Sequence, residues 1–255
     1  MSLIIRNILY WLGLVLVTVP YSLVALLVLP LPRRVRHRIV TSWVPVMLWW
    51  LRQTVGLRFT VLGRENIPTT PAVIASKHQS GWETMALQQV FPPQVFVSKR
   101  ELMWVPFFGW GLATVSPIWI NRSNPVLAGQ QLAEQGLARI ALGFWISVFP
   151  EGTRTAPGTR APYKMGAARL AQNLKIPLVP VALNSGEFWP RNSFLKYPGE
   201  ITVVVGPPVT AVGRDTREVM SEVEAWIEAR QLEIGGVGPK AAPPQRAARQ
   251  LRENS

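Results

Sequence analysis

The sequence predicts an α/β domain, a sheet flanked by helices, that follows an N-terminal membrane-embedded helical segment. Two observations lead to this fold class. A long apolar stretch without a charged residue lies near the start of the chain, at residues 8–31. Beyond Gly56, short apolar runs bounded by turn residues alternate with longer segments of helical spacing, a pattern typical of strands and helices arranged in layers. A chain of 255 residues is long enough for a full hydrophobic core.

The first apolar stretch has the length of a membrane segment. A helix over residues 8–31, rising about 1.5 Å per residue, would cover the roughly 30 Å hydrocarbon core of a bilayer. A cleavable signal peptide is disfavoured, because the stretch is long and lacks a small-residue cleavage pattern before Pro30 and Pro32. A buried hairpin of a soluble protein is also disfavoured, because few soluble helices are apolar on all sides over this length.

A second apolar stretch, residues 39–51, is too short to span a bilayer. It carries Trp43, Trp49 and Trp50, and Trp favours the headgroup boundary. Pro20 also interrupts the first stretch. These features favour two short helices that lie in one leaflet, while a single spanning helix remains the alternative.

Four arginines between the two stretches indicate the orientation. Lys and Arg concentrate on the cytoplasmic side of membrane segments. The bulk of the chain is therefore expected on the cytoplasmic side of the inner membrane. The four residues are Arg33, Arg34, Arg36 and Arg38.

The body of the chain contains six short apolar runs that predict buried strands. They cover residues 72–76, 94–98, 115–120, 145–149, 178–183 and 201–205. Between them, residues 126–142 and 165–174 have helical spacing. Asp215 and Glu218 resemble a capping pair ahead of a last helix, which is expected to cover the core and not to form a site.

Composition divides the chain into three parts. Residues 1–55 are predicted to form N-terminal membrane helices, and residues 56–235 the α/β domain. Residues 236–255 are rich in Gly, Pro, Ala and Arg and are expected to form a mobile basic tail, because they offer little apolar surface for packing.

The balance of charges narrows the class of partner. Lys and Arg outnumber Asp and Glu by 27 to 14, so the surface attracts anions such as nucleic acid, acidic lipid or an acidic carrier protein. Nucleic acid is disfavoured, because the basic residues form no helical stripe or known binding module. A chain that is 48% hydrophobic and contains eleven Trp residues fits a membrane surface better.

The residue types present also exclude several chemistries. The absence of Cys excludes disulfides, thiolate metal ligands and a Cys nucleophile. Two His and a single Asp are too few for the usual clustered metal site. No G-x-S-x-G or G-x-x-x-x-G-K motif occurs, which argues against a covalent Ser intermediate and a bound nucleotide. Neither a metal nor a cofactor is therefore expected.

The first group of candidate residues follows the predicted strand 72–76. His78 would stand at the end of the sheet, where sites of α/β proteins are common, and imidazole can take a proton near neutral pH. Ser80 and Glu83 fit a capping box at the start of a helix. If His78 lies in the turn before that helix, Glu83 could fold back and hold its imidazole. A purely structural cap is the alternative for Glu83.

The second group, Glu151 to Arg154, lies between the predicted strand 145–149 and a loop. Backbone N–H groups, a hydroxyl and a guanidinium in such a loop can surround a phosphate, although an ordinary turn is the alternative. Lys99 and Arg122, each near the end of a predicted strand, would add positive charge at the same sheet end or lie solvated on the surface.

With these residues, the chain closely resembles glycerolipid acyltransferases of the 1-acylglycerol-3-phosphate acyltransferase type over about residues 60–210. Four blocks are similar to those of the family and occur in the same order. They are HQSGWE at 78–83, KRELMWVPFFG at 99–109 followed by Asn121 and Arg122, FPEGTR at 149–154, and IPLVPV at 176–181. In the family the acid of the first block is more usually Asp, so Glu83 is a departure.

The resemblance implies the family's α/β acyltransferase fold and its reaction in phospholipid biosynthesis. A fatty acyl group would pass from acyl-ACP or acyl-CoA to the sn-2 hydroxyl of 1-acylglycerol 3-phosphate (lysophosphatidic acid), giving phosphatidic acid. His78 would be the base and Glu83 its partner. The residues implied to bind the acceptor phosphate and glycerol are Lys99, Arg122, Glu151, Gly152, Thr153 and Arg154.

Two alternatives to this function remain open. The acceptor could instead be glycerol 3-phosphate or a lyso-ornithine lipid. The chain could also be a noncatalytic membrane protein that binds anionic lipid through the same basic loops, although such a protein has no use for His78 next to Glu83.

Overall fold

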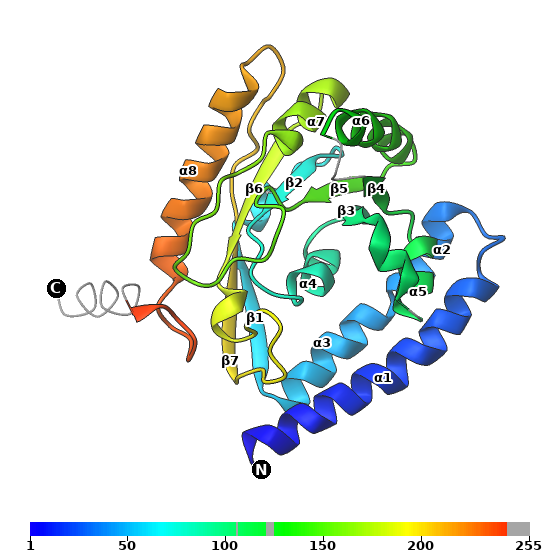
Figure 1. Cartoon of the computed structure of the whole chain (residues 1–255), viewed down its shortest axis with the longest axis vertical. Coiled ribbons are helices and arrows are strands. Elements are labelled where there is room, and N and C mark those ends of the chain that lie inside the picture. Colours follow the sequence, from blue (N-terminus) through cyan, green and yellow to red (C-terminus); the bar gives the residue numbers. More distant parts are fainter. Residues whose placement is uncertain (106, 121–124, 244–255) are drawn as a thin grey trace.

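The computed structural model describes residues 1–105, 107–120 and 125–243. In this part of the chain, seven strands form one mixed sheet in the order β1-β7-β6-β2-β5-β3-β4 (Figure 1). Neighbouring strands are parallel except for β6 and β7, which are antiparallel. The strands are β1 (Leu57–Leu62), β2 (Val73–Ser76), β3 (Gln94–Lys99), β4 (Ile118–Ile120), β5 (Trp145–Val148), β6 (Leu178–Leu183) and β7 (Gly199–Val205).

The α/β class and the six predicted strands are confirmed. Strand β4 is shorter than predicted, because a helix extends to Thr114 and Ser116 adopts left-handed backbone (φ 61°) before the strand begins. Strand β1 was not predicted from the sequence. It lies at the edge of the sheet with alternating burial and therefore lacks the continuous apolar run of a central strand.

Helices cover the sheet and open the chain. The helices of the described residues are α1 (Leu3–Leu27), α2 (Arg33–Thr41), α3 (Trp43–Thr54), α4 (Glu83–Val90), α5 (Phe108–Thr114), α6 (Pro125–Ala141), α7 (Gly166–Leu174) and α8 (Thr216–Ile234), with short 3-10 turns η1 (Arg64–Asn66), η2 (Arg100–Trp104) and η3 (Ser185–Glu187). Helices α6 and α7 closely match the predicted segments 126–142 and 165–174.

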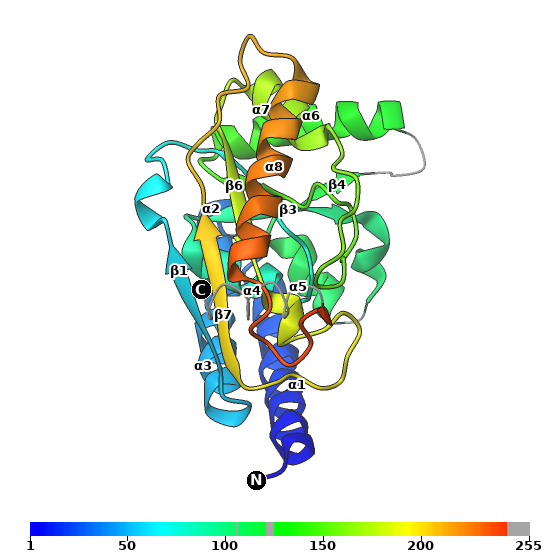
Figure 2. The ribbon, with the colours of Figure 1, turned by 90° about the vertical axis from the view of Figure 1, so that its left-hand side faces the viewer.

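Two hydrophobic cores lie on opposite faces of the sheet. Val73 and Ala75 of β2 pack in the core that includes residues of α6, α7 and α8. Ile74, between them, packs in the core formed with α3 and α4. Figure 2 shows α8 across the near face of the sheet. The central strands are thus buried on both faces, which explains their uniformly apolar sequences.

Helix α1 is long and apolar enough to cross a membrane, and only 17% of its most apolar window is buried. It packs beside α3 and α5 (Figure 1). Val44, Met47 and Leu48 of α3 belong to the same core as the sheet. Residues on both sides of the division expected near residue 55 therefore share one core, and the division itself stays a prediction.

The C-terminal helix begins as the sequence suggested. The carboxylate of Asp215 accepts hydrogen bonds from the backbone N–H groups of Arg217 at 2.7 Å and Glu218 at 3.3 Å. Such a cap satisfies donors that the first helical turn leaves unpaired.

The segment after Gly235 differs in part from the mobile tail expected there. The buried carboxylate of Glu187 accepts hydrogen bonds from the backbone N–H groups of residues 236, 237 and 238, at 2.7, 3.0 and 2.7 Å. Ala241 is buried as well. A single acidic side chain thus holds a segment whose own composition provides little packing. Residues 244–255 lie outside the described residues, and their mobility stays a prediction.

Candidate active site

The two groups of candidate residues meet at one edge of the sheet. Strands β2 and β5 are parallel neighbours, with Ala75 opposite Val148, so the segments that follow them leave the sheet at the same edge. The backbone N–H of Thr155 donates a hydrogen bond of 2.8 Å to the carbonyl oxygen of His78. The sheet therefore brings together motifs that are about seventy residues apart in sequence.

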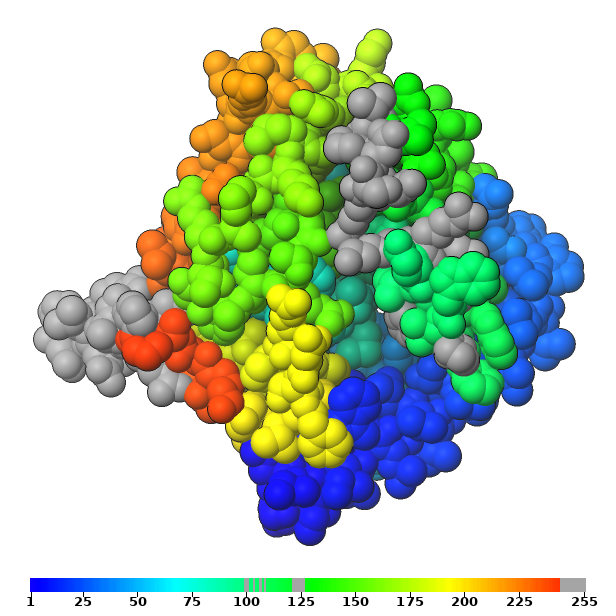
Figure 3. Space-filling model, in the orientation of Figure 1, coloured from blue at the N-terminus to red at the C-terminus, as the bar shows by residue number. Residues whose placement is uncertain are grey.

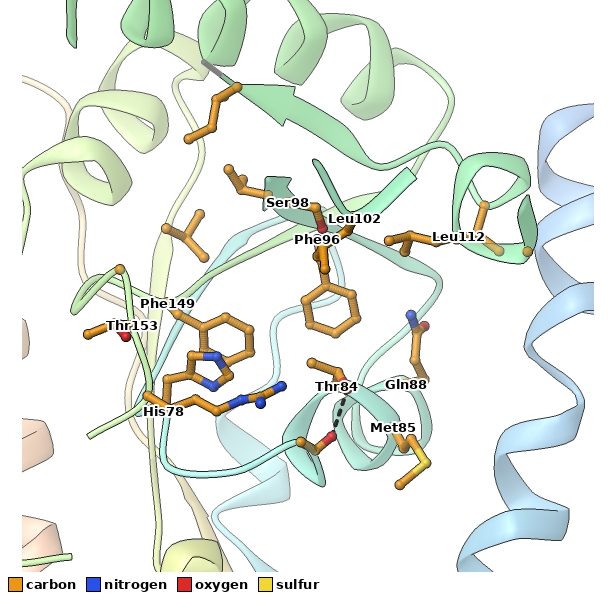
Figure 4. A pocket seen from close by; sticks show the side chains of 18 of the residues that line it. His78, Thr84, Met85, Gln88, Phe96, Ser98, Leu102, Leu112, Phe149 and Thr153 are labelled. Atoms are coloured by element: carbon orange, nitrogen blue, oxygen red, sulfur yellow. Dashed lines mark hydrogen bonds between the residues drawn. The ribbon is translucent and has the colours of Figure 1, made fainter. Parts of the chain in front are cut away.

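His78 lies in the turn between β2 and α4, as the sequence predicted. Its imidazole is half-buried and stacks on the ring of Phe149, with 3.8 Å between the ring centroids. Both rings face the cavity (Figure 4). A base in this position can reach a bound hydroxyl group while its ring plane is held by a neighbouring side chain.

Glu83 is completely buried at the start of α4. Its carboxylate accepts hydrogen bonds from the backbone N–H groups of Gln79 and Ser80, at 2.7 and 2.8 Å. The hydroxyl groups of Ser80 and Ser185 donate to it at 2.7 and 2.8 Å. Burial raises the pKa of the Glu83 carboxyl, and these hydrogen bonds oppose the rise. The contacts support the structural role of Glu83 in the turn that carries His78, while direct pairing with the imidazole stays a prediction.

Glu151, the first residue of the second group, faces inward. Its carboxylate lies 2.7 Å from the ammonium group of Lys77. It also accepts hydrogen bonds of 2.8 Å from the backbone N–H of His78 and from the hydroxyl of Thr155. Burial raises the pKa of Glu151, whereas Lys77 and the two hydrogen bonds lower it. Both oxygens of this carboxylate thus have partners in or beside the His78 turn, while the acceptor contact that the resemblance implied stays a prediction.

The three residues after Glu151 line the cavity. Gly152 has a φ of 70°, and a Cβ atom there would come within 3.0 Å of the Lys164 ammonium nitrogen, so this turn favours glycine. One terminal nitrogen of Arg154 lies 3.7 Å from the position that a Cβ on Gly81 would occupy. The Arg154 guanidinium therefore extends from the second motif to the first.

For Lys99 and Arg122, the two remaining residues expected to bind the acceptor, the structure describes no side chain. Lys99 ends β3, a parallel neighbour of β5, so its backbone reaches the same edge of the sheet. The side chain of Lys99 and the whole of Arg122 lie outside the described residues. Their roles as acceptor ligands stay predictions.

A large cavity of about 1810 Å³ connects these residues to the N-terminal helix. The residues that line it include His78, Thr153 and Arg154 as well as apolar side chains of α1 and α3. In Figure 3, the surface is hollowed between the segments near residues 150–165 and 102–112, drawn in light green and turquoise. The volume exceeds the roughly 300–1,000 Å³ of pockets for ordinary small ligands, and the lining suits an amphipathic molecule.

Two residues near the site were not singled out from the sequence. Lys77 immediately precedes His78 but points away from the cavity into a buried ion pair. Ser185 follows β6 and donates to Glu83 across the sheet edge. The sequence contains only a weak signal for the ion pair beside His78, one Lys next to one His, and no signal for Ser185. Among the described residues, no group of three His, Cys, Asp or Glu could hold a metal ion.

Comparison with known proteins agrees with this geometry. An acyltransferase family model matches residues 58–184. A 1-acyl-sn-glycerol-3-phosphate acyltransferase of Pseudomonas aeruginosa is 42% identical in an alignment of 246 positions that covers 94% of this chain and 96% of that protein. An acyltransferase of the same name from Cocos nucifera is 28% identical, over 84% of this chain and 70% of that protein.

A solved structure has the same fold. The crystal structure of the 1-acyl-sn-glycerophosphate (LPA) acyltransferase PlsC from Thermotoga maritima superimposes with a TM-score of 0.71 at 20% identity, covering 89% of this chain and 95% of that one. The fold, the site and the matched domain define an acyltransferase. The chain belongs to the 1-acyl-sn-glycerol-3-phosphate acyltransferase family.

Proposed function

We propose that this enzyme transfers a fatty acyl group from acyl-ACP or acyl-CoA to the sn-2 hydroxyl of 1-acylglycerol 3-phosphate, giving phosphatidic acid. One observation carries the proposal: His78 and Arg154 open on a single cavity whose remaining walls are largely apolar and extend to α1. Such a cavity can hold the phosphate of the acceptor near Arg154 and its acyl chain along the apolar walls.

In the proposed reaction, His78 removes the proton of the acceptor hydroxyl while its oxygen attacks the thioester carbonyl carbon. The negative charge that develops on the carbonyl oxygen requires hydrogen-bond donors, supplied by backbone N–H groups or by Lys99. When the tetrahedral intermediate collapses, the C–S bond breaks, and the thiolate takes the proton from the imidazolium. The products are the new ester and the free thiol, and no covalent enzyme intermediate is needed.

Arg154, Thr153 and Gly152 are proposed to bind the acceptor phosphate. A guanidinium offers paired donors that match phosphate oxygens. The position of Arg154 near Gly81, in the turn that follows His78, supports this role. A phosphate held there would lie beside the turn that carries His78.

The packing of α1 supports the embedded hairpin more than a spanning helix. Near its start, the indole N–H of Trp11 donates to the carbonyl of Phe194 at 3.0 Å. Near its other end, Tyr21 and Ser42 share a hydrogen bond of 3.2 Å. The first half of α1 is thus attached to the α/β domain, and its second half to the junction of α2 and α3. A helix that crossed the bilayer would draw the loop around Phe194 into the hydrocarbon.

The membrane surface is proposed to cover the exposed side of this helix. Apolar side chains of α1 are solvent-exposed beside the cavity, among them Leu12, Val15 and Leu16. The acceptor could enter from one leaflet without leaving the lipid phase. The arginines after α1 support a cytoplasmic placement of the domain, where thioester donors are available.

An acceptor competition assay tests the proposal. The purified protein is given labelled lysophosphatidic acid with acyl-CoA or acyl-ACP in turn, and glycerol 3-phosphate or a lyso-ornithine lipid as competitor. We expect labelled phosphatidic acid, little competition, and loss of turnover in His78→Ala with lipid binding retained. Near-normal turnover in His78→Ala would exclude this residue as the base. Preferred acylation of a competitor would show that the competitor, and not lysophosphatidic acid, is the acceptor. Lipid binding without any transfer would favour the noncatalytic alternative.

A further inference from the structure

Lys77 forms a buried ionic connection behind the catalytic turn. The residue is 1% exposed, and its backbone N–H continues β2 by donating to Val181 at 2.9 Å. Its ammonium nitrogen lies 2.7 Å from a carboxylate oxygen of Glu151 and 2.8 Å from one of Glu228 in α8. Adjacent residues of an extended chain point to opposite sides, so Lys77 enters the interior while His78 faces the cavity.

The two oxygens of Glu151 have separate partners. One contacts the ammonium of Lys77 and the hydroxyl of Thr155. The other accepts the backbone N–H of His78 at 2.8 Å. The charge of Lys77 is therefore connected through one carboxylate to the backbone of the proposed base.

An uncompensated carboxylate at this position would be costly. The side chain of Glu151 is fully buried, and burial favours its neutral form. A protonated Glu151 would present a donor where the N–H of His78 and the hydroxyl of Thr155 now require acceptors. Loss of the ammonium group would thus disturb the turn that holds His78, even though Lys77 does not reach the cavity.

Helix α8 completes the arrangement from the other side. Glu228 accepts hydrogen bonds from Lys77 at 2.8 Å and from the hydroxyl of Tyr163 at 2.9 Å. This contact fixes the ammonium group between two carboxylates. A helix that the sequence suggested was only core cover therefore supports the catalytic turn as well.

We propose that Lys77 is a positioning residue of the acyl transfer reaction, which holds Glu151 as a carboxylate and through it fixes the backbone of His78. The inference rests on the proposed function, in which His78 is the base. It assigns Glu151 to the same positioning role. It also predicts a specific kinetic pattern, because an imprecisely held base slows the chemical step and leaves acceptor binding largely intact.

The test compares Lys77→Met with the matched control Lys175→Met, which removes an exposed Lys at the end of α7. We expect Lys77→Met to lower kcat by about ten- to a hundredfold while the acceptor KM changes less than about threefold, and Lys175→Met to behave as wild type. Adding Glu151→Gln to Lys77→Met should lower kcat by a much smaller factor than Glu151→Gln lowers it in the wild-type protein, because both changes break the same connection.

The pH profile separates positioning from general loss of structure. Without Lys77, the pKa of Glu151 should rise, so kcat of Lys77→Met should recover in part as pH increases, relative to wild type. The charged or titratable groups around the pair are His78, Tyr163, Glu224, Glu228 and Arg160. Lys175→Met leaves the Lys77–Glu151 ion pair intact, so its kcat should follow the wild-type pH profile, without the gain at high pH.

Hydrogen–deuterium exchange provides a readout that does not depend on activity. Peptides covering residues 77–83 should exchange faster in Lys77→Met than in wild type or Lys175→Met. Unchanged exchange there, or wild-type kcat in a folded Lys77→Met protein, would overturn the inference while the proposed function stands. If wild-type protein acylates no acceptor, the proposed function fails, and the exchange comparison still decides whether Lys77 positions the turn.

Discussion

The imidazole of His78 lies nearly flat against the ring of Phe149, with an angle of 13° between the ring planes. Phe149 in turn stacks on Phe96, at 5.9 Å between centroids and 9° between planes (Figure 4). Phe96 belongs to β3, so the imidazole of His78 rests on a stack of rings that begins in the sheet. The loop that carries Arg154 thus also orients His78.

Replacing Phe149 by Leu should therefore lower kcat without removing the base. A stacked aromatic pair contributes about 0.5–1.5 kcal/mol beyond its buried area, which corresponds to a loss of roughly two- to tenfold if the stack positions the ring in the transition state. Phe149→Tyr keeps the stack and is the control. Steady-state kinetics on lysophosphatidic acid would measure both, and equal kcat in Phe149→Leu and wild type would contradict an orienting role.

Substitutions of Glu83 should separate the charge of its carboxylate from its length. Glu83→Asp is expected to keep substantial activity, because it preserves an acceptor for the hydroxyl of Ser185 and the neighbouring N–H groups. Glu83→Gln should lose most activity, since its amide places a donor among donors. Thermal unfolding of both variants provides the control for folding. Wild-type turnover in Glu83→Gln would leave only the capping role.

Arg154→Lys should raise the KM of the acceptor and barely change that of the thioester. Lys keeps the charge but lacks the planar pair of donors. A lost charged hydrogen bond costs about 1.5–3 kcal/mol, or roughly ten- to a hundredfold in acceptor kcat/KM. Initial rates with each substrate varied in turn would measure this. A rise in the donor KM at constant acceptor KM would place Arg154 on the thioester side.

Lys196 should make stability depend on pH. Its side chain is fully buried, with the ammonium nitrogen 3.7 Å from the ring centroid of Trp11 and 4.8 Å from that of Trp189. Burial lowers the pKa of Lys196 to about 7, whereas an unfolded Lys titrates at about 10.4. Between these values the unfolded chain binds more protons, so the contribution of Lys196 to the free energy of unfolding rises with pH and is smallest below pH 7.

The measurement compares the Tm of wild type and Lys196→Met in detergent at pH 7 and pH 9.5. We expect the Tm of wild type to rise relative to that of Lys196→Met as pH increases. Lys175→Met, which removes an exposed charge, should follow wild type. A difference in Tm that stays constant between the two pH values would contradict the assignment.

Much of the fold follows from local sequence, because a strand buried on both faces must be apolar throughout. This is why the bounds of β6 are predicted correctly from residues 178–183. The edge strand β1 cannot be predicted in the same way, since exposed residues such as Arg58 interrupt its apolar pattern. The boundary near residue 55 is inferred from composition, whereas only tertiary packing places α3 in the core of the sheet.

The same division holds at the site. The sequence by itself determined that His78 and the Glu151–Arg154 loop each follow an apolar strand and offer an imidazole and a guanidinium, because these properties depend on residue type and order along the chain. Only the tertiary structure decided that Glu151 turns inward to Lys77 and that Glu228 joins them. Side-chain direction depends on partners far away in the chain, and α8 contributes its carboxylate from 151 residues beyond Lys77. No local pattern of residues contains that contact.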